Sequence, residues 1–352
     1  MTASGSTTPP ATTPPQGSSR SKWATRTLDA GVRVGGLALA IIIVIAIFTL
    51  IAKPNTFLTL SNSLVIMRGM STIAIVALGL LLVIVVGEID LSFGFMYGLA
   101  ATLISVSWIV WGWPIYLAIL LPFAVAIFVG AVNALLVTVV KIPSFIVTLG
   151  TGQLIFGCTL LISNVQTLNP VYAPPGKEVP EGEIDFFFGL SNQDLPMDVP
   201  MQGLWMFGVA VIVGMLLSRT LFGFRLKAIG GNPLAAQLAR LPITKYKFSA
   251  FIVAALLASL AAMLDFAFIG STQPNAGVSL LFPVFAAVII GGASLAGGRG
   301  TAIGTLLGAL LLAIIANGLA LLSAGAFLSN FVAGTVTIAA VVLDRFTQTL
   351  RR

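Results

Sequence analysis

The sequence predicts an all-α protein that crosses a membrane about ten times. Of its 352 residues, 58% are hydrophobic and only 8% are charged, whereas a soluble domain carries roughly 25% charged residues. The mean hydropathy is +1.06. The apolar residues also gather into runs of about 20, the length of a helix that crosses the hydrocarbon core of a bilayer. A polytopic membrane protein is the only class that fits these observations.

The first 33 residues are predicted to be a disordered basic tail. Residues 1–20 are rich in Thr, Pro, Ser and Gly, and they carry too little apolar surface to fold. The basic residues Arg20, Lys22, Arg26 and Arg33 then precede the first apolar run. No small-residue cleavage site is evident, so we interpret this run as an uncleaved span and not as a signal peptide.

Ten apolar runs are predicted to span the bilayer. They cover residues 34–52, 64–86, 94–110, 114–140, 143–163, 203–218, 248–269, 282–296, 302–323 and 326–343. The fourth run is over-long and is expected to tilt or bend. Together they form a transmembrane domain over residues 34–345, and a short tail follows at 346–352.

Charge placement predicts the orientation of these spans. With the N-terminus in the cytoplasm, the loop 219–247 also falls inside, and its charged residues are all basic (Arg219, Arg225, Lys227, Arg240, Lys245 and Lys247). The loop 164–202 falls outside and sets six acids against Lys177 alone (Glu178, Glu181, Glu183, Asp185, Asp194 and Asp198). This agrees with the positive-inside rule, with Lys53 and Arg68 as exceptions. The even number of spans returns the C-terminus to the cytoplasm.

The two long loops have different expected roles. The proline-rich loop 164–202 is either a packed cap over the helices or a docking surface for an external partner. In the loop 219–247, Asn232 and Pro233 suit the first positions of a helix. Strong helix formers follow, and Pro242 ends the pattern. We expect a short helix there that offers Leu238 and Leu241 to a groove of a neighbouring subunit.

Composition excludes several other classes of function. The chain has no histidine and a single cysteine, Cys158, so disulfide frameworks, zinc sites and His- or Cys-based catalysis are not expected. The net charge of +7 is explained by basic cytoplasmic loops, and no nucleic-acid partner is expected. The sequence has no Gly-x-x-x-x-Gly-Lys-Ser/Thr loop for ATP.

Carboxylates lie within or beside the apolar runs, where charge is costly and typical of a solute path. Glu88 and Asp90 share one motif, residues 87–94, with Ser92. They are interpreted either as a polar gate or as a helix cap with Glu88 facing water. Asn133 and Asn317 are either lining residues or interhelical hydrogen-bonding groups, and a structural role is expected for Asp265.

Four blocks of sequence resemble motifs of the permease subunits of bacterial ABC importers for monosaccharides, the family of the ribose and xylose systems. They are residues 87–94; residue 133 with 141–150; residues 228–233 with 235–236; and residues 288–295 with 297–300, 304, 308 and 317–318. Their order and spacing match over roughly residues 35–345. Glu88, Leu234 and Pro242 depart from the usual pattern, which affects the identity of the solute more than the class of function.

The resemblance implies an ABC importer permease fold and a location in the bacterial cytoplasmic (inner) membrane. It also implies that the chain is a transporter subunit and not an enzyme. Residues 230–244 would be the coupling element, with these contacts to an ATPase: Gly230, Gly231, Asn232, Pro233, Ala235, Ala236, Leu238 and Leu241. The candidate solute path or gate is Glu88, Asp90, Ser92, Asn133, Ser294 and Asn317. No cofactor is expected on this chain, because ATP would be used by partner subunits.

The implied partners are two ATP-binding subunits, a second permease copy or a similar chain, an extracytoplasmic solute-binding protein and the lipid bilayer. The expected function is import of a monosaccharide or related polyol. A related importer for a nucleoside, a furanone signal or an amino acid stays open. A secondary transporter coupled to ions through Glu88, Asp90 and Asp265 is a further alternative, and ATP dependence of uptake separates it from the importer.

Overall fold

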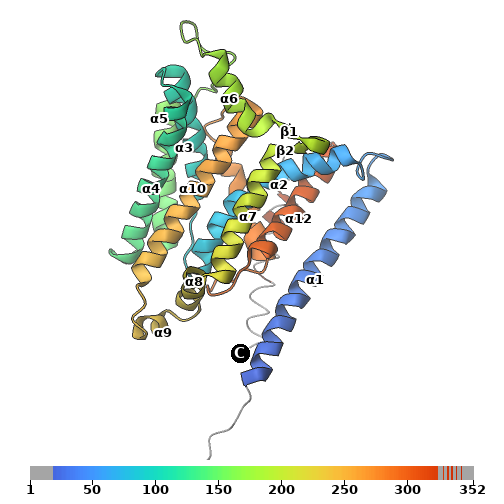
Figure 1. Cartoon of the computed structure of the whole chain (residues 1–352), viewed down its shortest axis with the longest axis vertical. Coiled ribbons are helices and arrows are strands. Elements are labelled where there is room, and N and C mark those ends of the chain that lie inside the picture. Colours follow the sequence, from blue (N-terminus) through green and yellow to red (C-terminus); the bar gives the residue numbers. More distant parts are fainter. Residues whose placement is uncertain are drawn as a thin grey trace, which may run out of the picture.

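Long helices run between two opposite ends of the molecule in the computed structural model (Figure 1). The structure describes the backbone of residues 19–323 and of 328, 331, 332, 334, 335, 338 and 342. The long helices are α1 (Ser19–Ile51), α2 (Leu60–Val85), α3 (Phe93–Ser105), α4 (Ile115–Thr138), α5 (Ser144–Ser163), α7 (Met201–Arg219), α10 (Ile243–Ile269) and α12 (Ala302–Leu321). A π-helical turn, Val106–Val110, continues α3. All helices after α1 belong to one packed bundle.

The predicted fold class is confirmed by these helices. Among the described residues, seven helices are long and apolar enough to cross a membrane, namely α2, α3 with its π-helical turn, α4, α5, α7, α10 and α12. The apolar parts of two further segments are shorter, at Gly35–Ile51 and Ala276–Ile290. Most of the tenth predicted span, 326–343, lies outside the described residues, as do residues 1–18 and 346–352.

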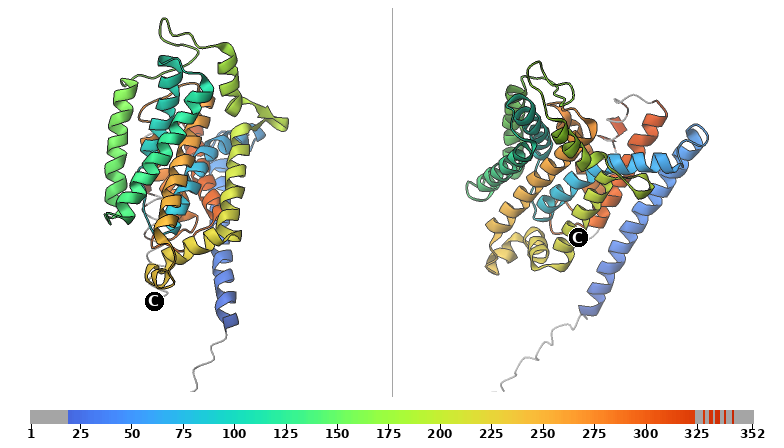
Figure 2. Two further views of the ribbon diagram at one scale, coloured as in Figure 1. Left: turned by 60° about the vertical axis from the view of Figure 1, so that its left-hand side comes forward. Right: turned by 45° about the horizontal axis from the view of Figure 1, so that its top comes forward.

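The centre of the bundle is α2, whose second half is apolar on every side. Its second half, from Ala74 to Val85, is almost completely inaccessible to solvent, as expected for a helix without a polar face. It packs against α10, α12, α7 and α11, and α10 in turn packs against α4 and α3. α1 stands at the edge of the bundle and contacts α12 (Figures 1 and 2).

Three predicted boundaries differ from the structure. α1 begins at Ser19, inside the segment predicted as a disordered tail, because residues 19–33 contain good helix formers that extend the first span. α10 begins at Ile243 and not at 248, directly after Pro242, which suits the position before a helix. The eighth span was predicted to reach residue 296, but α11 (Leu281–Ile290) ends where two glycines follow.

The eighth segment is a short helix inside the bundle. A 3-10 turn, Ala276–Leu280, leads into α11, which at ten residues is only about 15 Å long. The turn packs against α3, and α11 packs against α12 and α2. Irregular backbone within a membrane domain is tolerated where protein surrounds it. After α11 the chain stays non-helical until Ala302.

Small elements cap the two ends (Figure 1). One end carries α6 (Glu181–Asn192) and a hairpin of β1 (Asp194–Leu195) and β2 (Val199–Pro200), paired Asp194 to Pro200 and Leu195 to Val199. We call it the α6 end. The opposite end carries α8 (Leu221–Gly231) and α9 (Pro233–Leu238), and we call it the α9 end. α6 is fixed by Phe187, which is fully buried and contacts the rings of Trp108 and Phe266.

Candidate functional site

The short helix α9 presents an apolar surface away from the bundle. Its first turn is capped by Asn232, whose side chain accepts a 3.0 Å hydrogen bond from the backbone nitrogen of Ala235, and Pro233 follows at the first helical position. Leu234 is 67% exposed and Leu238 is 78% exposed. Large apolar side chains held out on a capped, rigid turn are typical of a contact that a partner covers.

The residues predicted to couple to an ATPase do not all face the same way. Exposed positions include Gly231, Asn232, Pro233, Ala235 and Leu238. Three others point toward the bundle. Gly230 and Ala236 are buried, and Leu241 is partly buried against the core. The predicted coupling segment therefore has an outward surface, formed by α9, and an inward surface that touches the membrane helices.

Gly230 makes the tightest of the inward contacts. A Cβ atom placed on it would lie 2.0 Å from the carbonyl oxygen of Val85, at the end of α2, and 2.7 Å from the backbone nitrogen of Gly298. The Gly298 nitrogen donates a 2.9 Å hydrogen bond to that same Val85 oxygen. Three segments far apart in sequence thus meet backbone to backbone at the α9 end.

α8 is held firmly to its neighbours. Arg225 donates a 3.1 Å hydrogen bond to the hydroxyl of Tyr246 on α10. Lys227 reaches the backbone oxygen of Leu217 at 3.0 Å, and burial lowers the pKa of this lysine. Because both ends of these bonds lie in helices, α8 and the adjoining ends of α7 and α10 form one packed unit.

The loop that follows α2 carries the carboxylates of the candidate gate. Glu88 forms an ion pair with Lys247 in the first turns of α10. Glu88 was predicted either to line a gate or to face water. Neither prediction included an ion pair with a lysine. The loop is thereby tied to α10 as well as to α2.

Asp90 and Ser92 lie together in a buried polar network. The Oδ1 atom of Asp90 accepts from the backbone nitrogen and the hydroxyl of Ser92, at 2.7 and 2.6 Å. Asn133 on α4 donates a 2.9 Å hydrogen bond to the Ser92 hydroxyl, and Thr151 on α5 donates one of 2.7 Å to the Asn133 oxygen. Burial raises the pKa of Asp90 to about 6, although the bonds from Ser92 oppose the shift. The structure therefore brings three of the six candidate path residues together.

Hydroxyl groups of α5 fasten the same loop. The backbone nitrogen of Ile89 donates to Ser144 at 3.1 Å, and that of Leu91 donates to Thr148 at 3.0 Å. These bonds satisfy backbone donors that burial would otherwise leave without partners. Ser144, Thr148 and Thr151 were not predicted as site residues, because hydroxyl residues in an apolar helix commonly bond their own backbone.

The other candidate path residues lie elsewhere. Asn317 on α12 donates a 3.0 Å hydrogen bond to Asn62 on α2. Of the two roles considered for Asn317, this bond corresponds to the interhelical one. Ser294 is buried in the turn after α11, where its backbone nitrogen bonds the oxygen of Arg299. Asp265 accepts hydrogen bonds from Thr72, at 2.6 Å, and from Tyr97, and so joins α10 to α2 and α3.

Gln153 is a polar residue that the sequence reasoning missed. It lies near the middle of α5 and is exposed, and no hydrogen bond joins its amide to another described residue. Gly150 and Gly157 flank it on the same side of the helix, with open space beside both. The spacing of one amide between two glycines, at three and four residues, is the signal that could have identified this side of α5.

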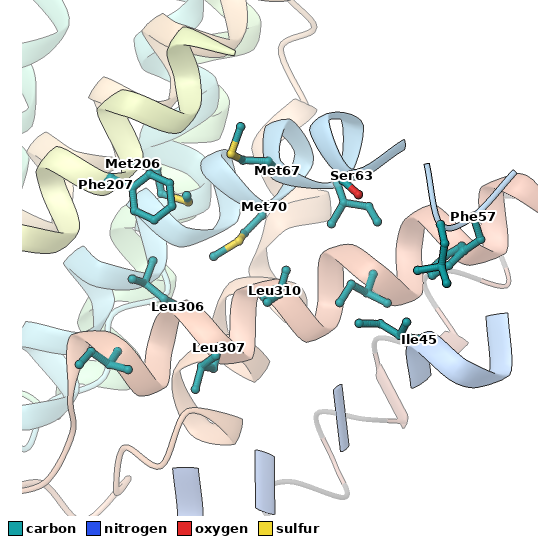
Figure 3. Close-up of a pocket in the computed structure, with 14 residues that line it drawn as sticks. Ile45, Phe57, Ser63, Met67, Met70, Met206, Phe207, Leu306, Leu307 and Leu310 are labelled. Atoms are coloured by element: carbon teal, nitrogen blue, oxygen red, sulfur yellow. The ribbon is translucent and has the colours of Figure 1, made fainter. Parts of the chain in front are cut away.

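One hollow of the described structure is an apolar groove, not a polar site. It has a volume of about 480 Å³ and lies between α1, α2, α7 and α12. Figure 3 shows Met67, Met70 and Met206 above the leucines of α12 that form its floor. None of the predicted site residues lines it. Ser63 supplies the only side-chain hydroxyl among its lining residues, and the others are apolar.

Comparison with known proteins places the chain beside bacterial permeases. A family model described as "Branched-chain amino acid transport system / permease component" matches residues 62–341. The ribose import permease protein of Bacillus subtilis is 34% identical over 302 residues, which cover 86% of this chain and 90% of the relative. A probable ABC transporter permease protein of Sinorhizobium fredii is 31% identical, with 88% of each chain covered. The xylose transport system permease protein of Escherichia coli is 28% identical, covering 88% of this chain and 91% of the relative.

Proposed function

Because this chain belongs to the branched-chain amino acid transport system / permease component family, we propose that it carries a monosaccharide or a related polyol into the cell. It is a multi-pass membrane protein and the permease subunit of a bacterial ABC importer, not an enzyme, and ATP is used by a partner. The observation that carries the choice of solute is the similarity to the ribose and xylose permeases over almost nine tenths of the chain.

The polar network of the loop suits an uncharged, hydroxylated solute. Ser92, Asn133 and Thr151 supply hydroxyl and amide groups that both donate and accept hydrogen bonds. A polyol that leaves water needs such groups to replace its lost hydrogen bonds. Uptake of radiolabelled ribose and xylose, compared with leucine and adenosine, tests the class of solute. Saturable uptake of leucine with no uptake of either sugar would overturn the choice.

The exposed leucines of α9 support docking of two ATP-binding subunits, one on each permease copy. The test is co-purification of the ATP-binding subunit with the native chain and with Leu238→Asp. We expect the variant to lose the partner, because an exposed charge would be buried in an apolar groove. Val171→Asp changes an apolar residue that is 55% exposed in the segment leading to α6, and this control should retain the partner. Equal recovery from both variants would contradict the assignment of α9.

The proposed orientation puts the α9 end and both chain termini in the cytoplasm. It is supported by the basic residues of 219–247 and the acidic residues of 164–202, because these two segments lie at opposite ends of the bundle (Figure 1). The α6 end would then face outward and receive the solute-binding protein. The orientation is tested by labelling single cysteines with an impermeant maleimide in intact cells. The cysteines replace Val171 or Leu238, and Cys158 is replaced by serine. Labelling at Leu238 alone would reverse the orientation.

A second permease copy, or a similar chain, is proposed to complete the solute path. The outward side of α5 supports this, since the Gln153 amide has no partner among the described residues and would otherwise face lipid. Interhelical contacts in membranes use small residues and polar side chains together. The ion-coupled alternative is less well supported, because the carboxylates that it needs are engaged in structural bonds. Glu88 pairs with Lys247, and Asp265 accepts from Thr72 and Tyr97.

A further inference from the structure

The contact around Gly230 joins three segments with almost no side chain between them. Besides the contacts of Gly230 itself, a Cβ atom on Gly297 would lie 2.7 Å from the oxygen of Gly230 and 2.9 Å from the Cα of Gly87. One on Gly298 would lie 2.6 Å from the Cα of Gly231. We call this contact the glycine joint. It comprises Val85 at the end of α2 and Gly87 just after it, Gly230 and Gly231 at the end of α8, and Gly297 and Gly298 in the turn after α11.

Backbone contact of this kind transmits displacement better than side-chain contact does. Long side chains can change rotamer when a neighbour moves, whereas backbone atoms at van der Waals distance have no such freedom. Gly298 adds a direct hydrogen bond to Val85. Gly87, Gly297 and Gly298 have positive φ angles of 89°, 83° and 75°, a conformation that residues with a Cβ rarely adopt. The joint therefore depends on glycine for both its spacing and its backbone shape.

The joint lies between α9, which is the proposed docking surface, and the loop 87–92 that follows α2. On one side, the exposed leucines of α9, Leu234 and Leu238, follow Gly230 after four and eight residues. On the other side, Gly87 opens the loop that carries Glu88, Asp90 and Ser92. That loop is fastened to α5 through Ser144 and Thr148 and to α10 through Lys247. A continuous series of backbone contacts and hydrogen bonds thus connects α9 with α5.

We propose that the glycine joint passes the movement of the ATPase-docking segment to the loop 87–92, with Gly230 and Gly298 as its positioning residues. The proposal rests on the proposed function, because it needs an ATPase at α9. It gives Gly230 a different role from the one predicted for it. Gly230 faces the membrane helices, so it transmits the movement and leaves the contact with the ATPase to α9.

The first test compares Gly230→Ala with Gly208→Ala in the complete transporter reconstituted in liposomes. A Cβ on Gly208, an exposed residue of α7, would meet no atom within 4 Å, so this variant is the control for adding a methyl group away from the joint. We expect both variants to retain the ATPase subunit and to hydrolyse ATP. For Gly230→Ala we expect at least a tenfold fall in solute molecules imported per ATP hydrolysed, and for Gly208→Ala a change of less than twofold. An unchanged ratio in Gly230→Ala would overturn the proposal.

A second measurement needs no substitution, so it holds even if Gly230→Ala does not fold. Hydrogen exchange of backbone amides is followed in the native complex before and after a non-hydrolysable ATP analogue binds. We expect the Gly298 amide and the Ile89 and Leu91 amides to change their exchange rates together. A change at Gly298 with none at Ile89 and Leu91 would show that movement stops at the joint, and the proposal fails. Loss of the ATPase subunit from the native chain would refute the proposed function itself.

Discussion

Asp90 shows how a carboxyl group is kept inside a membrane protein. It is only 1% exposed, and no cation is bonded to it among the described contacts. Two hydrogen bonds from Ser92 stabilise its charged form, but burial is the larger influence and raises its pKa from 3.8 to about 6. The charged form at neutral pH therefore costs free energy in the folded state, on the order of 3 kcal/mol for two pKa units.

The sign of this shift predicts how stability depends on pH. The folded state holds the proton of Asp90 more tightly than the unfolded state does, so this group stabilises the fold below pH 4 and loses that effect as pH rises through about 6. Asp90→Asn keeps an oxygen that can accept both bonds and removes the charge. We expect the variant to match the native chain at pH 4 and to be more stable at pH 8, by up to about 3 kcal/mol.

Thermal unfolding in detergent between pH 4 and pH 8 measures this difference. Asp198→Asn, at an exposed position of the hairpin turn, is the control and should follow the native chain throughout. If Asp90→Asn tracks the native chain at both ends of the range, Asp90 is not the group that titrates.

Only part of the site could be predicted at the scale of residues. Asp90, Ser92 and Asn133 stood out because polar residues in apolar runs are rare, and the structure places them in one network. The pairing of Glu88 with Lys247 could not be predicted, since 159 residues separate them and only the packing of α10 beside the loop brings them together. Asn317 met the same criterion as Asn133, yet it bonds Asn62. The sequence pattern alone does not show whether a buried asparagine joins the polar network of the loop or bonds a neighbouring helix.

At the scale of elements, α5 has one packed side and one open side. The packed side carries Ser144 and Thr148 against the loop, and the open side carries Gln153 between Gly150 and Gly157. If a second copy of this chain packs there, a two-fold axis brings the same residues of both copies close together. We therefore expect Gly157→Cys, with Cys158 replaced by serine, to form a covalent dimer when membranes are oxidised.

The control for this prediction uses the same serine background. Ile212→Cys introduces a cysteine at a position of α7 that is 60% exposed, and it should remain monomeric. Because Cys158 is the only cysteine of the chain, no other thiol can contribute. Dimers from Ile212→Cys together with monomers from Gly157→Cys would move the contact to another helix. Monomers from both would indicate a similar chain, not a copy, as the partner.

Most spans were predictable because their apolar runs match the thickness of a bilayer. The predictions were wrong where local backbone chemistry decides a boundary. α11 stops at Gly291 although apolar residues continue beyond it, because Gly292 takes a positive φ of 89°. α6 was not predicted within 164–202, because its helical signals are local: acidic residues in the first turn and one buried aromatic, Phe187. Tertiary contacts with Trp108 and Phe266 stabilise it.

At the scale of the whole molecule, the source of energy for transport can be tested. The carboxylates that ion coupling would use, Glu88, Asp90 and Asp265, are engaged in structural bonds. We therefore expect ATP, and not an ion gradient, to supply the energy for transport. We expect solute uptake by the complete transporter reconstituted in liposomes to stop when the ATP supplied to its ATP-binding subunits is replaced by a non-hydrolysable analogue. Uptake should persist when a protonophore and a sodium ionophore collapse the ion gradients at constant ATP. Uptake in liposomes that contain this chain alone, driven by an imposed proton gradient, would instead favour an ion-coupled carrier.

The ten-residue length of α11 has a consequence for how the protein is made. A segment of 10–14 apolar residues is too short to be accepted by a bilayer as a span in its own right. The preceding turn packs against α3, and α11 finds its apolar neighbours on α2 and α12. We therefore expect residues 276–290 to be integrated only after α12 has been synthesised. In that case α11 and α12 would insert together against helices already in the membrane.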